Sequence, residues 1–219
     1  MRVGFVTIGQ SPRVDVVPEI KPYLGAGVEI IECGALDDLT LEEIKKLAPK
    51  EGDYVLVTRL RDGTQVRLSR EKIIKRLQEC IKKLEERVDV IGVLCTGEFP
   101  ELTSRKLLVE PSLLLLKTVE ALNVSNLGVI VPDPDQVEIT KRKWEGVAKS
   151  IKVRSVSPYV GKEDEFIRAA QELKECDLIV MDCIGYKLSF KEIVKEITKK
   201  PVVLPRTLMA RVIGELLEG

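Results

Sequence analysis

Residues 88–97 read Val-Asp-Val-Ile-Gly-Val-Leu-Cys-Thr-Gly, an apolar run that ends on a cysteine, Cys95. Similar runs, rich in Val and Ile, recur at residues 3–8, 28–31, 54–58, 127–131, 152–156, 178–181 and 202–204. Near-continuous apolar runs of this length are typical of parallel strands that are buried on both faces of a sheet. Because ligands bind beyond the carboxyl ends of such strands, the residues that follow each run are the first candidates for a functional site.

Longer amphipathic segments separate these runs and predict helices. Residues 40–43, Thr-Leu-Glu-Glu, have the pattern of a capping box, and residues 69–86 carry apolar side chains at helical spacing. Further helices are expected at residues 162–174, 190–199 and 207–217. One segment differs, because the Asp-Gly pair at 62–63 favours a β-hairpin over residues 55–68. Alternation of strands and helices predicts an α/β chain with parallel sheets.

The length of the chain bears on how these strands are arranged. Eight parallel strands can close a (β/α)8 barrel, but that fold typically takes about 250 residues, and this chain has 219. Two four-stranded units suit the length better. We therefore expect a first α/β half over residues 1–111 and a second over residues 112–206, with the crossing at Glu110-Pro111-Ser112.

Composition excludes several classes of function. The chain has no His, so it contains no Ser-His-Asp triad, no His-assisted Cys nucleophile and no HExxH zinc site. Proton transfer near neutral pH must then use Cys, Asp, Glu, Lys or Tyr. The net charge is zero, no basic tract suits a nucleic acid, and no run reaches the roughly 18 apolar residues of a membrane helix. From the charge and the lack of a long apolar run we expect no nucleic-acid partner and no membrane partner. The chain opens directly on a strand pattern, so we also expect no signal peptide.

Five cysteines occur at irregular spacing without a CxxC pair. We expect free thiols in a reducing cytoplasm, and no metal site. The many charged residues and few Asn and Gln resemble the composition of thermophile proteins. Cys33, Cys80 and Cys176 are interpreted as packing residues.

Cys95 and Cys183 stand out because each follows an apolar strand and lies two residues before a glycine, Gly97 or Gly185. This placement favours backbone N–H donors near the sulfur, which lower the pKa of a thiol. A single buried Cys is more often a small packing residue. Two of them at matching positions in two similar halves favour a functional pair.

The turn after the first strand, Thr7-Ile-Gly-Gln-Ser-Pro-Arg13, is a second candidate. Gly9 permits a tight turn, and Ser11 and Pro12 suit the cap and first position of a helix, whose free N–H groups would face an anion. Arg13 would add a bidentate contact to a carboxylate. The alternative is an ordinary strand-to-helix turn with a surface arginine. No GxGxxG or GxxxxGK[ST] motif is present, so a dinucleotide cofactor is not expected.

Several segments together resemble the AroM family. They are residues 7–13, 110–112, 128–132, the pair Lys143-Trp144, and residues 182–185. That family is similar to the aspartate/glutamate/hydantoin racemase superfamily, in which two flavodoxin-like halves face each other across a central cleft that holds the active site. The resemblance implies this fold here, with a C-terminal helix over residues 207–219 that packs back on the first half. We expect its apolar face to be Leu208, Val212, Ile213 and Leu216.

The resemblance also implies a chemistry. Racemases of that superfamily, and maleate isomerase, use one Cys from each half, whereas arylmalonate decarboxylase uses a single Cys, and none needs a cofactor. This places Cys95 and Cys183 in the two Cys positions. The sequence departs from racemases after each Cys: Thr96-Gly97 replaces a pair such as Asn-Thr, and Ile184-Gly185 replaces Thr-Glu or Thr-His. The Thr that would hold a substrate carboxylate is absent, which argues against an amino-acid substrate.

The first hypothesis is therefore a cofactor-independent racemase, epimerase, isomerase or decarboxylase. Cys95 as thiolate would take a proton next to the carboxylate of a small organic acid, and Cys183 as thiol would return one. The residues expected at the substrate are Gly9, Gln10, Ser11, Arg13, Thr96, Gly97, Ile184 and Gly185.

Two other hypotheses remain open. One is a non-catalytic protein that binds or senses a small carboxylate on the same fold. The other is covalent chemistry at a single Cys, as in an addition–elimination isomerase. A homodimer is a further possibility, since members of that superfamily are often dimers or larger.

Overall fold

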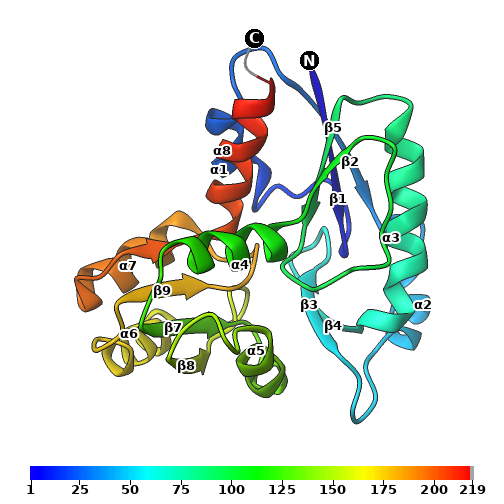
Figure 1. Cartoon of the computed structure of the whole chain (residues 1–219). Helices are drawn as coiled ribbons and strands as arrows, with labels where there is room; N and C mark the ends of the chain where they lie inside the picture. Colours follow the sequence, from blue (N-terminus) through cyan, green and yellow to red (C-terminus); the bar gives the residue numbers. More distant parts are fainter. Residues whose placement is uncertain (218–219) are drawn as a thin grey trace.

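Two four-stranded parallel sheets form the framework of the computed structural model, which describes residues 1–217 (Figure 1). The first sheet has the order β2-β1-β5-β6 and the second β10-β9-β7-β8. Their bounds are β1 Arg2–Thr7, β2 Glu29–Gly34, β5 Val90–Leu94, β6 Leu107–Val109, β7 Asn126–Val131, β8 Ser150–Ser155, β9 Leu178–Met181 and β10 Val202–Val203. In each sheet the first strand lies between the second and the third, so the two halves share one flavodoxin-like strand order. The predicted α/β fold of two parallel halves is confirmed.

The predicted hairpin is confirmed as β3 (Val55–Arg59) and β4 (Gln65–Ser69), which pair antiparallel apart from both parallel sheets. Figure 1 places it beyond the carboxyl end of β1. The expectation that the run at residues 54–58 is a parallel strand of the first half is therefore wrong, and the fourth strand of the first sheet is instead β6, a three-residue strand at the sheet edge. The sequence did not predict β6, because Leu107 is exposed and so short a run shows no burial pattern.

Eight α-helices lie within the described residues. They are α1 Val17–Ile20, α2 Leu41–Lys46, α3 Arg70–Glu85, α4 Pro111–Ala121, α5 Val137–Lys143, α6 Glu163–Glu172, α7 Leu188–Thr198 and α8 Pro205–Leu217, with 3-10 turns at Lys21–Tyr23 and Pro134–Gln136. The capping box at Thr40 is present. The helix start predicted at Ser11 and Pro12 is wrong, since α1 begins only at Val17.

Helices cover both faces of the first sheet, with α3 on one face and α1 and α8 on the other (Figure 1). Helix α8 packs its buried Met209 and Ile213 against Phe5 of β1. The predicted apolar face of α8 is correct at Ile213 and wrong at Leu216, which is 45% exposed. Leu208 and Val212 are half-buried, and Glu218 and Gly219 lie outside the described residues.

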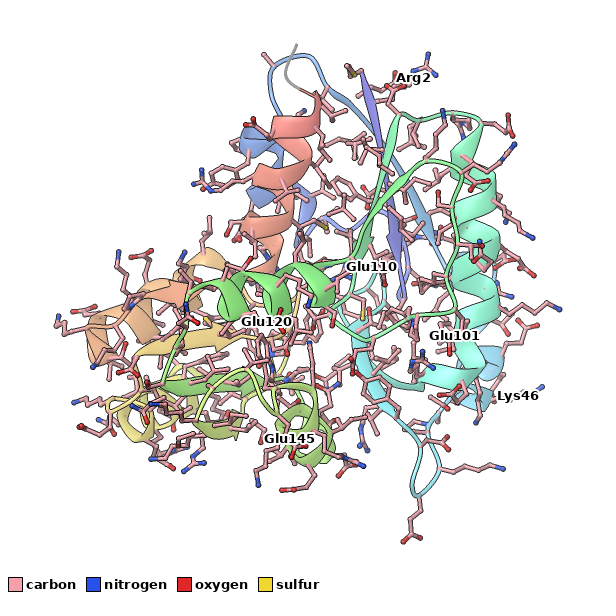
Figure 2. The ribbon with its side chains drawn as sticks, viewed as in Figure 1. Arg2, Lys46, Glu101, Glu110, Glu120 and Glu145 are labelled. Atoms are coloured by element: carbon pink, nitrogen blue, oxygen red, sulfur yellow. A yellow bond between two sulfur atoms is a disulfide. The ribbon has the colours of Figure 1, made fainter. Side chains whose placement is uncertain are left out.

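The crossing between the halves is visible in Figure 2, where the labelled Glu110 lies at the start of α4. Helix α4 then runs beside α8 at the junction of the two sheets. The strands of the first sheet precede residue 111 and those of the second follow it. The division at residues 111 and 112 stays a prediction.

A disulfide joins Cys33 of β2 to Cys80 of α3. The expectation of five free thiols is therefore wrong for this pair. The packing of α3 on the sheet brings the two Cα atoms to 5.6 Å, within the usual range for a disulfide. Cys95, Cys176 and Cys183 are free and buried. Within residues 1–217, no helix combines the length and apolar character needed to cross a membrane.

Candidate functional site

A cavity of about 30 Å³ lies between the two halves, and both halves contribute to its wall. The first half supplies Arg13, the strand β3, and the segment from Leu94 to Gly97 that follows β5. The second half supplies residues of α5, Tyr159, and the segment from Asp182 to Ile184 that follows β9. The cavity thus lies beyond the carboxyl ends of the third strand of each sheet, where ligands of parallel sheets bind.

Cys95 enters this cavity from the end of β5. The backbone N–H of Gly97 donates to its Sγ atom at 3.3 Å, as the spacing of Cys and Gly predicts. Burial raises the pKa of the Cys95 thiol to about 11, against the opposing influence of the Gly97 N–H and of the charges of Arg13 and Lys143. The thiol is therefore protonated at neutral pH.

Cys183 occupies the matching position in the second half. The N–H of Gly185 donates to its Sγ at 3.4 Å. Burial and, to a smaller extent, the proximity of Cys95 raise its pKa to about 12, against the opposing influence of the Gly185 N–H and of the Arg13 charge. The donors expected near both sulfurs are confirmed, but the expected net lowering of the thiol pKa is wrong. Removal from water destabilises a thiolate more than one backbone N–H stabilises it.

A buried ion pair fastens the two cysteine-bearing segments together. Lys143 Nζ lies 2.8 Å from a carboxylate oxygen of Asp182 and donates to the carbonyl of Thr96 at 3.3 Å. The hydroxyl of Thr96 donates to the carbonyl of Asp182 at 3.1 Å, and the indole N–H of Trp144 donates to the Asp182 carboxylate at 3.2 Å. The side chains of Lys143 and Asp182 are only 5% and 4% exposed. These contacts hold the loop after Cys95 against the residue before Cys183.

Arg13 reaches the cavity, but its guanidinium is already well partnered. It donates to both carboxylate oxygens of Asp15, at 2.9 and 2.8 Å, and to the hydroxyl of Thr7 at 2.9 Å. It also donates to the hydroxyl of Tyr159 in the other half at 3.1 Å. Burial alone would raise the pKa of Asp15, but the hydrogen bonds and charge of Arg13 hold it below its usual value. A contact between Arg13 and a substrate carboxylate stays a prediction.

The other polar groups of the turn after β1, residues 9–11, form hydrogen bonds with groups of the first half. The N–H and hydroxyl of Ser11 both donate to the Asp37 carboxylate at 2.6 Å, and the N–H of Gly9 donates to the hydroxyl of Thr7 at 3.2 Å. The side chain of Gln10 bonds main-chain groups of the same half. Gly9, Gln10 and Ser11 do not line the cavity in this structure.

The structure brings together six of the predicted site residues in the cavity wall. They are Arg13, Cys95, Thr96, Gly97, Cys183 and Ile184. Gly185 stays outside the wall. A Cβ atom at this position would lie 2.5 Å from the hydroxyl of Tyr159, so a glycine is needed there.

Sequence reasoning did not single out Thr58, Tyr159, Lys143 or Asp182 as site residues. Asp182 directly precedes Cys183, which is a usable signal. Nothing in the sequence places Thr58 or Tyr159 at the cavity, because the folding of the hairpin and of the loop after β8 decides their position. Within the described part of the chain, no group of three or more Cys, Asp or Glu could hold a metal ion.

Comparison with known proteins adds a family and a fold. The family model described as AroM protein matches residues 3–217. Allantoin racemase from Klebsiella pneumoniae is 12% identical, with a TM-score of 0.64 over 99% of this chain and 87% of its own. An arylmalonate decarboxylase is 16% identical, with a TM-score of 0.64 over 100% of this chain and 93% of its own. Glutamate racemase from Aquifex pyrophilus is 16% identical, with a TM-score of 0.61 over 100% of this chain and 84% of its own. No curated protein matches the sequence.

Proposed function

The chain belongs to the AroM family, and from its fold and cavity we propose that it is a cofactor-independent enzyme of the racemase or isomerase type. In this proposal it moves a proton next to the carboxylate of a small organic acid. The observation that carries the proposal is the pair of free, buried thiols, Cys95 and Cys183, one from each half in the wall of one cavity. The racemases and the decarboxylase with the same fold support it.

The proposed reaction begins with ionisation of one thiol. Cys95 has the lower of the two pKa values, and the charges of Arg13 and Lys143 favour its thiolate. The Cys95 thiolate takes the proton from the carbon next to the carboxylate, and the Cys183 thiol donates a proton to the opposite face. The roles reverse for the other enantiomer. Backbone N–H groups around Thr96 and Gly97, and the Arg13 guanidinium, stabilise the charge that develops on the carboxylate oxygens.

The cavity between the two halves is small, with a volume of about 30 Å³. The walls belong to different sheets, and contacts such as that between Arg13 and Tyr159 join them. We infer that this is the closed form and that the halves open to admit the substrate.

Exchange of the α-proton in heavy water, followed by NMR with a panel of small chiral acids, tests the proposal. The wild-type protein is expected to exchange at least one acid, and the double variant Cys95→Ser/Cys183→Ser none. Cys176→Ser is the matched control, because Cys176 is also free and buried but lies outside the cavity wall. The proposal is wrong if the wild type exchanges no acid, or if the double variant exchanges as fast as the control.

A second candidate function is a small-molecule binding protein without catalysis. The high pKa values of both thiols favour it, as does the apolar Ile184 in the wall directly after Cys183. It predicts that a small acid binds equally well to the wild type and to the Cys95→Ser/Cys183→Ser variant, with no turnover by either. Loss of affinity on replacement of Cys95 alone would argue against it.

A further inference from the structure

One face of strand β3 forms part of the cavity wall. Side chains alternate between the two faces of a strand, so Leu56 and Thr58 lie on one face, together with Tyr54 just before the strand. All three line the cavity, and Val57 between Leu56 and Thr58 also contributes to its wall. A Cβ atom at Gly97 would lie 2.8 Å from Cδ2 of Leu56, which places the Leu56 side chain directly against the loop that follows Cys95.

Thr58 presents a polar group that the protein itself does not use. The residue is 1% exposed. Its Oγ1 is buried and has no hydrogen-bond partner, and among the buried side-chain oxygens and nitrogens of residues 1–217 it alone lacks one. Gly9 makes room for it, because a Cβ atom at Gly9 would lie 2.4 Å from this oxygen. Burial of an unpartnered hydroxyl is unfavourable. Because Thr58 lies in the cavity wall, a ligand that reaches past its side chain to this hydroxyl and bonds to it removes that penalty.

The charges of the wall limit the charge of that ligand. Arg13 and Lys143 are the two cations among the wall residues, and each is paired with a carboxylate, Asp15 or Asp182. Neither cation is unpaired, so each carboxylate of a ligand adds a buried negative charge, and a dicarboxylate adds two. Transfer of an unpaired charge into such a site is strongly unfavourable.

Part of the remaining wall is apolar, although Thr96, Gln136, Thr140 and Tyr159 also line it. Leu56, Ile139 and Ile184 contribute aliphatic side chains, and Tyr54 contributes an aromatic ring. An alkyl or aryl substituent on the reacting carbon would bury apolar surface against them, whereas a second carboxylate would lose its hydration without compensation.

We propose that β3 is the specificity-determining strand of the site: its Thr58 hydroxyl donates to the single carboxylate of the substrate, and Leu56 and Tyr54 contact an apolar substituent. The substrate class is thus a small acid with one carboxylate and an apolar group, and not a dicarboxylate. This inference rests on the proposed function for the location of the site, and it names the substrate of that site.

The test uses two 2-hydroxy acids of nearly the same shape. 2-Hydroxy-4-methylpentanoate carries an isobutyl group on the reacting carbon, and malate carries a carboxymethyl group at the same place. Their binding to the full chain is measured by isothermal titration calorimetry. The wild type is expected to bind the first acid at least tenfold more tightly. Thr58→Val, which removes only the hydroxyl, is expected to weaken this binding about tenfold to a hundredfold, as for loss of a hydrogen bond to a charged group.

Two variants and one further measurement complete the design. Thr58→Ser keeps the hydroxyl and is expected to retain most of the affinity. Thr64→Val makes the Thr-to-Val change at an exposed position of the same hairpin, and we expect it to leave the affinity unchanged. Urea unfolding verifies that Thr58→Val is at least as stable as the wild type, so that weaker binding is not a folding defect. The inference is overturned if malate binds as tightly, if neither acid binds at 10 mM, or if Thr58→Val binds like the wild type.

The binding data separate this inference from the proposed function. If the affinities follow the pattern above in the Cys95→Ser/Cys183→Ser variant but the wild type exchanges no α-proton, the specificity stands and the proposed catalysis fails. If the wild type exchanges protons of dicarboxylates as readily as those of monocarboxylates, the catalysis stands and the specificity fails.

Discussion

Replacement of Lys143 by Met is expected to destabilise the protein, because it leaves the Asp182 carboxylate buried without its cation. Lys143 Nζ lies 2.8 and 3.1 Å from the two carboxylate oxygens of Asp182, and both side chains are at most 5% exposed. Removal of one partner from such a pair costs about 3–5 kcal/mol. Because the Trp144 indole still donates to Asp182, we expect the lower end, about 3 kcal/mol. For a chain of this size that corresponds to a fall in Tm of roughly 6–12 °C.

Urea unfolding of matched variants measures this effect. Lys143→Met is expected to lower the unfolding midpoint without a change in the slope m. Lys141→Met is the control, because Lys141 pairs with Glu138 on the surface and its removal should change stability by less than about 0.5 kcal/mol. The double variant Lys143→Met/Asp182→Asn should be more stable than Lys143→Met, since no buried charge is left unpaired. A loss below about 1 kcal/mol for Lys143→Met, or simple additivity in the double variant, would show that the ion pair with Asp182 contributes little to stability.

Three further predictions concern the thiols, the disulfide and the cavity wall. If the Cys95 thiolate is the base, the exchange rate follows the fraction of thiolate. Because the pKa of Cys95 is about 11, we expect the rate to rise about tenfold per pH unit from pH 7 to about pH 10. A rate that is flat or falls over this range contradicts the assignment. The double variant Cys33→Ala/Cys80→Ala is expected to lose about 3–4 kcal/mol of stability, because the disulfide closes a loop of 47 residues; an unchanged Tm by calorimetry would argue against it. Thr58→Val is expected to raise the unfolding free energy by about 1 kcal/mol, because it removes a buried hydroxyl without a partner; a clear loss of stability in urea would show that the hydroxyl is partnered in solution.

The parallel strands and the positions of Cys95 and Cys183 were predictable from the sequence. Buried parallel strands are near-continuous apolar runs, and the ends of such strands meet at one edge of a sheet. The spacing from each Cys to the next glycine also predicted the N–H donor at each sulfur. These features depend on local sequence pattern, which a single chain displays directly.

The features that the sequence did not reveal depend on tertiary packing. The pKa of Cys95 is set mainly by burial, which outweighs the local donor and cannot be judged from spacing. The pairing of Lys143 with Asp182 joins residues 39 positions apart, and the disulfide joins residues 47 apart. Thr58 reaches the cavity only because the hairpin folds over the end of the first sheet, in the room that Gly9 leaves.

If the two thiols act on opposite faces of one carbon, each thiol removes the α-proton from one enantiomer only. The decisive measurement is the initial rate at which each enantiomer of an exchanging acid loses its α-proton in heavy water, for the wild type, Cys95→Ser and Cys183→Ser. We expect Cys95→Ser to abolish exchange from one enantiomer and Cys183→Ser from the other, while wild-type protein exchanges both. Equal loss for both enantiomers on replacement of Cys95, with no effect of Cys183→Ser, would contradict the two-thiol mechanism and indicate chemistry at a single cysteine.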